Sequence, residues 1–232
     1  MGKRIIQQRR GRGSLTYQVR TGAYRFKIGY PVKLVGEGKV LRLINSRGHT
    51  APLAKIKYRE GMFYIPAFKG MIEGQTIKFE QGEIKDGNIL RLKNIPIKTK
   101  VYNVESRPGD GGKYIRTSGN YAEVSKVSDK EVFVMMPSKK EKGLNSECRA
   151  IIGVIAGAGR LDKPILKAGK MHYIKKSKNR LWPRTSAVKM NVVDHPFGSG
   201  RGKRIKSKIA KRNAPAGARV GLIRPRRTGK KK

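Results

Sequence analysis

Residues 53–66 read LAKIKYREGMFYIP, and this stretch indicates how the central part of the chain folds. Its two halves, residues 53–58 and 63–66, are short and rich in β-branched and aromatic side chains. The pair Glu60-Gly61 between them is typical of a turn. The stretch therefore predicts two short β-strands with a turn between them.

The same pattern continues on both sides of this stretch. We predict further strands at residues 32–35, 40–43, 76–80, 89–92, 100–105, 113–117, 121–127, 131–136 and 150–156. Strands spaced at about 8 to 12 residues are typical of small barrels rather than of a parallel α/β sheet. Helical periodicity is weak apart from residues 166–176, where we predict a short helix. The expected fold is mainly β, with two small barrels that join near residues 94–96.

The charge of the chain is large and uneven. There are 55 Lys plus Arg against 15 Asp plus Glu, a net charge of +40. Residues 1–36 hold 9 basic residues and no acid, and residues 163–232 hold 23 basic residues and one acid, Asp194. Residues 37–162 carry 23 basic and 14 acidic residues, as the surface of an ordinary folded domain does. We therefore expect a folded middle with two basic arms.

Such a charge points to a polyanionic partner, and nucleic acid is the first choice. A membrane surface is the rival, but no apolar run reaches about 18 residues and no signal-type segment follows Met1, so we expect an intracellular protein without membrane partners. The single cysteine, Cys148, excludes an internal disulfide framework and a cysteine-rich zinc site. We expect it to be a small buried apolar residue.

One pair of residues is a candidate for catalysis. Residues 191–204 read NVVDHPFGSGRGKR and place Asp194 beside His195. Dinucleotide, phosphate-loop and metal-ligand motifs are incomplete elsewhere in the sequence. Pro196 favours extended backbone at His195, where neighbouring side chains point to opposite sides, so Asp194 is poorly placed to orient the ring. We predict that Asp194 caps the loop through backbone N–H groups. His195 is then an RNA contact or a structural histidine, with acid–base catalysis the weakest alternative.

Both arms have features of RNA-binding segments. Glycines among arginines let the backbone approach a crowded surface and let N–H groups converge on an anion, as expected at Gly198, Gly200 and Gly202. A solvated basic tail without a specific fit is the alternative. In the N-terminal arm, aromatic residues alternate with basic ones from Tyr17 to Tyr30. These rings could stack on unpaired bases or anchor the arm on the first barrel.

The stretch NVVDHPFGSG resembles the signature of the L-two family of large-subunit ribosomal proteins, written MNxVDHPFGGG in archaea. Further matches follow in the family's order and cover nearly the whole chain. They are residues 11–14 (GRGS), 51–54 (APLA), 94–96 (NIP), 103–105 (NVE), 108–112 (PGDGG), 116 with 118–121 (R, SGNY), 148–150 (CRA), 167–169 (KAG) and 182–184 (WPR). The chain departs from the family at Ser186, Ala187, Lys189, Val192 and Ser199. Phe197 resembles the archaeal branch.

The resemblance implies a division of the chain into four parts. They are a basic arm at 1–31, an oligonucleotide-binding-type barrel at 32–93, an SH3-like barrel at 94–165, and a short helix with an extended basic RNA-binding tail at 166–232. From the residues and the resemblance together we expect RNA contacts at Arg9, Arg10, Arg12, Arg116, Trp182, Arg184, Asn191, His195, Gly198, Gly200, Arg201, Lys203, Arg204, Lys206, Lys208, Lys211 and Arg212.

The resemblance also implies a function in the ribosome, in the cytoplasm. The protein would bind large-subunit ribosomal RNA and other ribosomal proteins, support assembly and association of the subunits, and lie near the peptidyl transferase centre without performing the chemistry. No cofactor, protein-owned metal or small-molecule substrate is expected. The alternatives are an RNA-acting enzyme or contributor to peptidyl transfer through His195, and a free translation factor.

Overall fold

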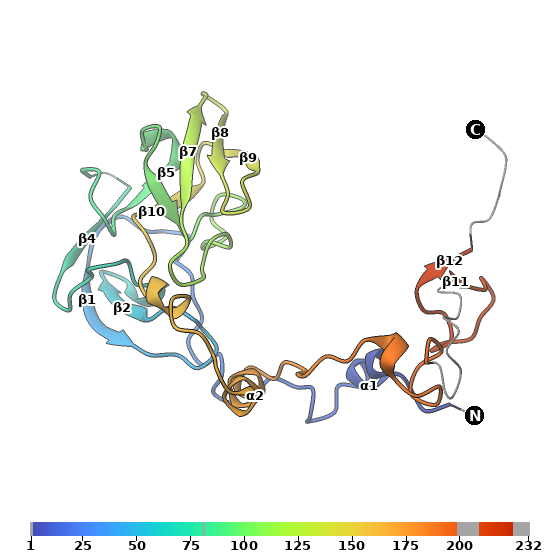
Figure 1. The fold of residues 1–232 in the computed structure, drawn as a ribbon. Coiled ribbons are helices and arrows are strands. Elements are labelled where there is room, and N and C mark those ends of the chain that lie inside the picture. The colour runs from blue at the N-terminus through green and yellow to red at the C-terminus, as the bar shows by residue number, and fades with distance from the viewer. Residues whose placement is uncertain (1, 81, 199–208, 225–232) are drawn as a thin grey trace, which may run out of the picture. The chain divides into compact units, whose positions relative to one another are not determined.

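The computed structural model describes residues 2–80, 82–198 and 209–224. The chain forms two compact units (Figure 1). We call Thr21–Leu166 the sheet unit, and Met1–Arg20 with Lys167–Lys232 the arm unit. No helix among the described residues is long and apolar enough to cross a membrane.

The sheet unit is built on ten hydrogen-bonded strands. They are β1 (Gly36–Ile44), β2 (Leu53–Tyr58), β3 (Gly61–Pro66), β4 (Thr76–Phe79), β5 (Ile89–Arg91), β6 (Lys100–Tyr102), β7 (Ala122–Val127), β8 (Glu131–Met135), β9 (Glu141–Asn145) and β10 (Arg149–Ile152). Their order is β3-β2-β1-β4-β5-β10-β6-β7-β8-β9, and pairing is antiparallel except between β4 and β5. Two 3-10 turns, η1 (Leu92–Asn94) and η2 (Ala158–Arg160), complete the unit.

The strands in the middle of this order contribute side chains to two hydrophobic cores. Because successive side chains of a strand point to opposite faces, Ile151 of β10 joins one core and Ile152 joins the other. The same alternation separates Ile89 from Leu90 in β5. The first core lies mainly among β1 to β4 and the second among β6 to β10. A mainly β fold is therefore confirmed, while the barrel types and the boundary at 93/94 remain predictions.

Two predicted strands are wrong. Residues 32–35 do not form a strand. Arg149 Nη1 donates to the carbonyls of Pro31 and Val32 at 3.0 and 3.1 Å, so these carbonyls accept from a side chain and not from a neighbouring strand. Residues 113–117 contain only an isolated bridge between Tyr114 and Val104. The positive φ of 56° at Ile115 interrupts extended backbone there.

Strand β9 and helix α1 (Ile6–Gly11) were not predicted from the sequence. The sequence of β9, EKGLN, has charged residues and a glycine and shows no strand pattern. In the structure only its Leu144 is buried. The segment is a strand because it pairs with β8 over five positions. Helix α1 lies in the N-terminal arm, where an extended basic segment was expected.

The segment that enters the sheet unit is held by a buried ion pair. Arg149 and Glu105 are 4% and 0% exposed, and Arg149 Nη2 lies 2.8 Å from Glu105 Oε1. The guanidinium also lies 4.9 Å from the ring centre of Tyr30. The Tyr30 hydroxyl lies 2.6 Å from the Asn103 carbonyl and 3.0 Å from the Arg149 carbonyl. Burial, followed by the charge of Glu105, raises the pKa of Tyr30 well above its ordinary value.

The arm unit contains little regular structure and little core. It holds α1, α2 (Ala168–Ser177), the 3-10 turn η3 (Ala187–Lys189), and the short parallel pair β11 (Ile209–Ala210) and β12 (Leu222–Ile223). Helix α2 confirms the helix predicted at 166–176. The buried apolar residues of its described part are Ile5, Ala210 and Val220. The arm unit therefore cannot draw much stability from apolar burial.

Candidate nucleic-acid interface

The loop at 190–198 is closed by its own backbone. The Asn191 carbonyl accepts hydrogen bonds from the N–H groups of Asp194 at 3.0 Å and His195 at 3.2 Å, and Gly198 N–H donates to the His195 carbonyl at 2.9 Å. Gly198 is buried, and a Cβ there would lie 2.4 Å from the Asn191 oxygen. This glycine is therefore required by the closure of the loop itself, and not only by the approach of RNA as the sequence suggested.

The ring of His195 is oriented by the same loop. The N–H of Phe197 donates to His195 Nδ1 at 3.1 Å, and the two rings lie 5.1 Å apart. Because Nδ1 accepts a hydrogen bond, the neutral ring carries its hydrogen on Nε2. A catalytic triad needs the reverse arrangement, with Nδ1–H donating to a carboxylate. The geometry therefore presents Nε2–H as a hydrogen-bond donor and disfavours acid–base catalysis.

Among the described residues, the contacts of Asp194 do not include the predicted loop cap. Its carboxylate lies 3.7 Å from Lys3 Nζ, and no backbone N–H of the described residues donates to it. The nearby amides already have acceptors, since those of Asp194 and His195 bond to Asn191 and that of Phe197 bonds to the imidazole. Asp194 instead pairs with the N-terminal segment, whose Lys3 N–H also donates to the Val193 carbonyl at 2.8 Å.

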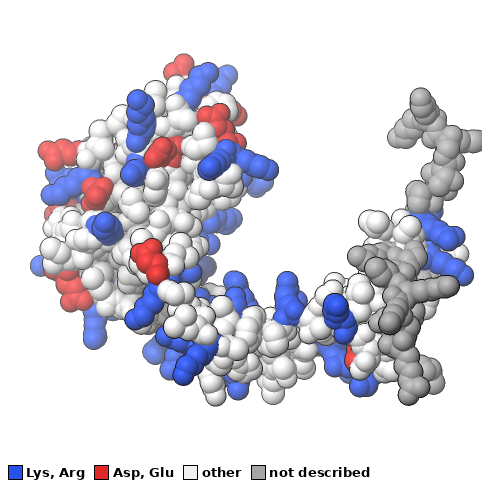
Figure 2. Space-filling model, in the orientation of Figure 1, with Lys and Arg blue, Asp and Glu red and all other residues white. Residues whose placement is uncertain are grey.

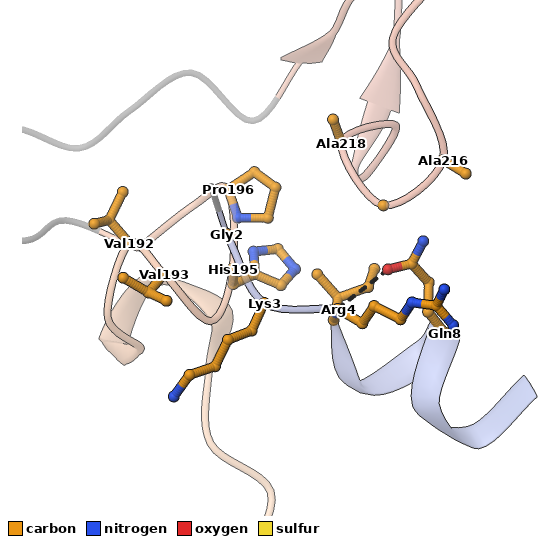
Figure 3. A pocket seen from close by; sticks show the side chains of 12 residues that line it. Gly2, Lys3, Arg4, Gln8, Val192, Val193, His195, Pro196, Ala216 and Ala218 are labelled. Atoms are coloured by element: carbon orange, nitrogen blue, oxygen red, sulfur yellow. Dashed lines mark hydrogen bonds between the residues drawn. The ribbon is translucent and has the colours of Figure 1, made fainter. Parts of the chain in front are cut away.

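His195 lines a hollow of about 510 Å³ within the arm unit. Figure 3 shows His195 and Pro196 on one side, the start of α1 on another, and the turn at 216–218 beyond them. Helix α1 is fixed there because the Gln8 side chain accepts the Ile5 N–H at 3.2 Å. Gly217 has a φ of 89° and packs so closely on Gln8 that a Cβ would lie 2.7 Å from Gln8 Oε1.

The lining of this hollow suits an anion. It includes the cations Lys3 and Arg4, the His195 ring and the small residues of the 216–218 turn, but no carboxylate side chain. Phosphate oxygens accept hydrogen bonds from cations and from N–H groups. The hollow, which we call the His195 hollow, can therefore accept a backbone phosphate of a nucleic acid.

The other predicted RNA contacts are distributed over both units. Arg9, Arg10 and Arg12 are exposed on α1 or directly after it. Arg184, Asn191 and Lys211 are also exposed, whereas Trp182 is half-buried in a second hollow. Arg212 is half-buried and donates to the Arg224 carbonyl at 3.4 Å. Gly200, Arg201, Gly202, Lys203, Arg204, Lys206, Lys208 and the departure at Ser199 lie outside the described residues.

Arg116 stands apart from this group because it belongs to the sheet unit. Its Nη1 lies 3.4 Å from the Ile28 carbonyl, so part of its donor capacity is used inside the protein. Lys3 and Arg4 were missing from the predicted site, although the charge count of the N-terminal arm included them. Their importance follows from contact with residues 192–196, almost 200 positions away along the chain, which spacing cannot reveal.

The charge is segregated between the units. The arm unit contains 28 Lys or Arg and one acidic residue, a net charge of +27. The sheet unit contains 27 Lys or Arg and 14 acidic residues, a net charge of +13. Figure 2 shows Asp and Glu interspersed with Lys and Arg over the sheet unit. No group of three His, Cys, Asp or Glu side chains among the described residues is arranged to hold a metal ion.

Comparison with known proteins agrees with these features. The family model "Ribosomal Proteins L2, C-terminal domain" matches residues 85–217, more than half of the chain. The chain belongs to the ribosomal protein L2 family. It is 46% identical to the large ribosomal subunit protein uL2 of Archaeoglobus fulgidus over 238 residues, which cover 99% of both chains. It is 43% identical to uL2 of Hyperthermus butylicus, with both chains covered completely.

Membership of the L2 family confirms the resemblance read from the DHPFG stretch, including its archaeal character. The L2 family consists of structural components of the ribosome rather than enzymes, so the catalytic alternative for His195 loses its basis. Family membership also implies ribosomal RNA and other ribosomal proteins as partners, and it places the protein in cytoplasmic ribosomes.

Proposed function

We propose that this chain is a structural constituent of the large ribosomal subunit that binds large-subunit RNA chiefly through its arm unit. In this role it supports assembly of the subunit and its association with the small subunit. The His195 loop lies near the peptidyl transferase centre without performing the chemistry. The observation that carries the proposal is the family match combined with a net charge of +27 in the arm unit.

The mechanism of binding follows from this charge. Lys and Arg that neutralise phosphates release counterions, so affinity falls steeply with salt. For about 6 to 10 phosphate contacts, the loss between about 50 and 200 mM salt is on the order of 10³- to 10⁵-fold. Sequence-specific reading of an RNA helix is restricted by its narrow major groove. Specificity therefore comes from the shape that the arm unit fits.

Within the arm unit, we assign separate tasks to the residues. The exposed Arg9, Arg10 and Arg12 contact phosphates, as do Arg184 and Lys211. His195 contributes a directed Nε2–H donor at the wall of the His195 hollow. Gly198 supports that donor by allowing the loop to close. We retain the predicted barrels at 32–93 and 94–165 and the contacts at 200–208 as part of this proposal.

The assembly role is tested by changing Arg184 together with the basic residues of 201–212 to Ala. We expect poor incorporation into large subunits and loss of the remaining protein in high-salt washes. Undisturbed incorporation and salt tolerance would contradict the proposed mechanism. A free translation factor, unlike an integral constituent, would leave wild-type subunits in the same wash.

The role of His195 is tested with His195→Ala in fully assembled particles, with His49→Ala in the sheet unit as the histidine control. We expect a single-turnover peptide-transfer rate that changes much less than about 100-fold, the low end for loss of a general base. A larger loss specific to His195→Ala would support direct participation in chemistry instead.

A further inference from the structure

A second hollow of about 430 Å³ in the arm unit combines aromatic rings with positive charge. The segment before the sheet unit and the end of α2 form its walls. Its lining residues with rings are Tyr17, His172 and Trp182, and those with charge are Arg20, Lys176 and Arg180. No carboxylate lines it, and its remaining lining residues are Leu15, Thr16, Asn179 and Leu181. We call it the Trp182 hollow.

The Trp182 hollow is built by specific backbone contacts. Helix α2 ends at Ser177, and Asn179 just after it lies in the left-handed region, at a φ of 49°. The N–H of Asn179 donates to the Lys176 carbonyl at 3.1 Å and that of Arg180 to the Lys175 carbonyl at 2.9 Å. This pattern is a Schellman motif, which stops the helix and fixes the direction of the chain towards Trp182.

Asn179 also connects the two walls, because its side-chain amide donates to the Gln18 carbonyl. The opposite wall is itself a closed turn, in which Tyr17 N–H donates to the Ser14 carbonyl at 2.8 Å and Gln18 Nε2 donates to the Gly13 carbonyl at 2.5 Å. Each wall therefore has a defined local conformation.

The residues of this hollow fit one class of ligand. Bases of unpaired RNA stack on aromatic rings, and cations beside the rings bind the adjoining phosphates. A volume of about 430 Å³ lies within the range of roughly 300 to 1,000 Å³ that is usual for sites that enclose a small ligand. An acidic protein segment would also bind the cations, but it would leave the three rings without a stacking partner.

We propose that the Trp182 hollow receives one unpaired nucleobase of ribosomal RNA, stacked on its rings, with the flanking phosphates bound by Arg20, Lys176 and Arg180. The inference rests on the proposed RNA-binding function and adds a base-accepting site that is separate from the His195 hollow. Because stacking uses the face of a base, the site accepts any of the four bases with modest preference.

The chain provides its own reporter, since Trp182 is its single tryptophan. The full-length protein is titrated with single-stranded RNA of about 10 nucleotides, a length that one small binding domain covers. A second strand has the same ribose-phosphate backbone and charge but carries abasic sites. We expect the RNA with bases to quench Trp182 fluorescence and to bind about 5- to 150-fold more tightly than the abasic strand. This ratio should persist as salt weakens both strands, because counterion release is the same for both.

Matched variants localise the effect. Tyr17→Leu should reduce the ratio between the two strands, whereas Tyr121→Leu, which removes a ring from the sheet unit, should leave it unchanged. Lys176→Gln should weaken both strands and lower quenching, while Lys175→Gln, its neighbour outside the hollow, should weaken binding without changing the quenching at saturation. These pairs keep the test valid even if one variant disturbs the fold.

The outcomes separate this inference from the proposed function. Equal affinity for both strands, or quenching that Tyr17→Leu does not change, would overturn the base-accepting site while leaving RNA binding intact. Failure of both strands to bind at low salt would overturn the proposed function and the inference with it.

Discussion

The sheet unit and the arm unit obtain their structure from different sources. All buried apolar residues of the described chain except Ile5, Ala210 and Val220 lie in the sheet unit, around two cores. The sheet unit also holds 14 of the 15 acidic residues. The arm unit has a net charge of +27 and closes its loops mainly with backbone hydrogen bonds.

The two units therefore differ in their need for a binding partner. Ordering each backbone residue costs about 1–2 kcal/mol, and apolar burial is the main compensation. The sheet unit has that compensation, whereas the arm unit has little of it and also repels itself. Binding to RNA supplies the missing free energy, because phosphates neutralise the charge that opposes a compact arm. We therefore expect the sheet unit to determine the stability of the free chain and the arm unit to determine its RNA affinity.

The largest effect on stability is expected from Glu105→Gln in the sheet unit. Glu105 is fully buried and accepts from Arg149 and from Gly111 N–H at 3.1 Å, so its loss leaves a buried guanidinium without an anion. We expect the free energy of unfolding to fall by about 3–5 kcal/mol, measured by urea denaturation. Glu147→Gln, which breaks the more exposed pairs with Arg91 and Lys93, is the control and should cost much less. An equal cost would mean that burial of the pair is unimportant.

The next effect separates charge in the arm unit from charge in the sheet unit. In one variant, five basic residues of the arm unit become Gln: Lys3, Arg4, Arg9, Arg10 and Arg12. In the control, five exposed lysines of the sheet unit become Gln: Lys57, Lys69, Lys85, Lys126 and Lys139. We expect RNA affinity to fall on the order of 10²- to 10³-fold in the first, since each lost phosphate contact removes about 0.9 from the salt slope. Affinity is measured by filter binding across a salt series. Equal losses in the two variants would contradict the conclusion that the arm unit determines RNA affinity.

The pH dependence of stability should reflect the sheet unit. Burial raises the pKa of the Cys148 thiol to about 11 from an ordinary value of 9.0. The folded state thus favours the neutral thiol, and this stabilisation is complete below about pH 9 and is lost as pH rises towards about 11. We expect about 1 kcal/mol to be lost per pH unit in that window, measured by urea unfolding. Cys148→Ala should show a shallower decline, and an unchanged slope would argue against this origin.

The smallest effect is expected from Asp194→Asn in the arm unit. Its ion pair with Lys3 is exposed on both sides, so solvent screens it and its loss should cost at most about 1 kcal/mol. RNA affinity should stay the same or rise slightly, because the arm unit loses its single negative charge. A large loss of affinity would show that Asp194 positions the His195 loop more strongly than its contacts indicate.

The prediction from sequence succeeded where local pattern decides structure. Residues 53–58 form β2 with the predicted bounds, and α2 lies close to the predicted helix. The prediction failed where contacts with residues distant along the chain determine the backbone conformation. Residues 32–35 have strand propensity, but the guanidinium of Arg149 binds the carbonyls of Pro31 and Val32 at the start of this segment. Strand β9 has no propensity, but β8 provides a complete hydrogen-bonding partner.

The candidate site also divides into residues that local sequence indicated and residues that only long-range contacts revealed. The sequence singled out His195 and its glycines, because DHPFG combines a titratable ring, a proline and a glycine within a few positions. It missed Lys3, Arg4, His172 and Arg180, because only folding brings the N-terminal segment against residues 172–196. The sequence also suggested that Asp194 caps the loop. The spacing of residues does not show that the neighbouring backbone N–H groups already donate to the Asn191 carbonyl and to the His195 ring.

Local periodicity, composition and motif order were enough to predict the mainly β character, the segregation of charge and the family. Three-dimensional contacts were needed to show which nitrogen of His195 donates, why Gly198 must be glycine, and which cations share a hollow with Trp182. The physical reason is that hydrogen-bond partners and burial depend on groups that are distant along the chain, and a local pattern carries no information about them.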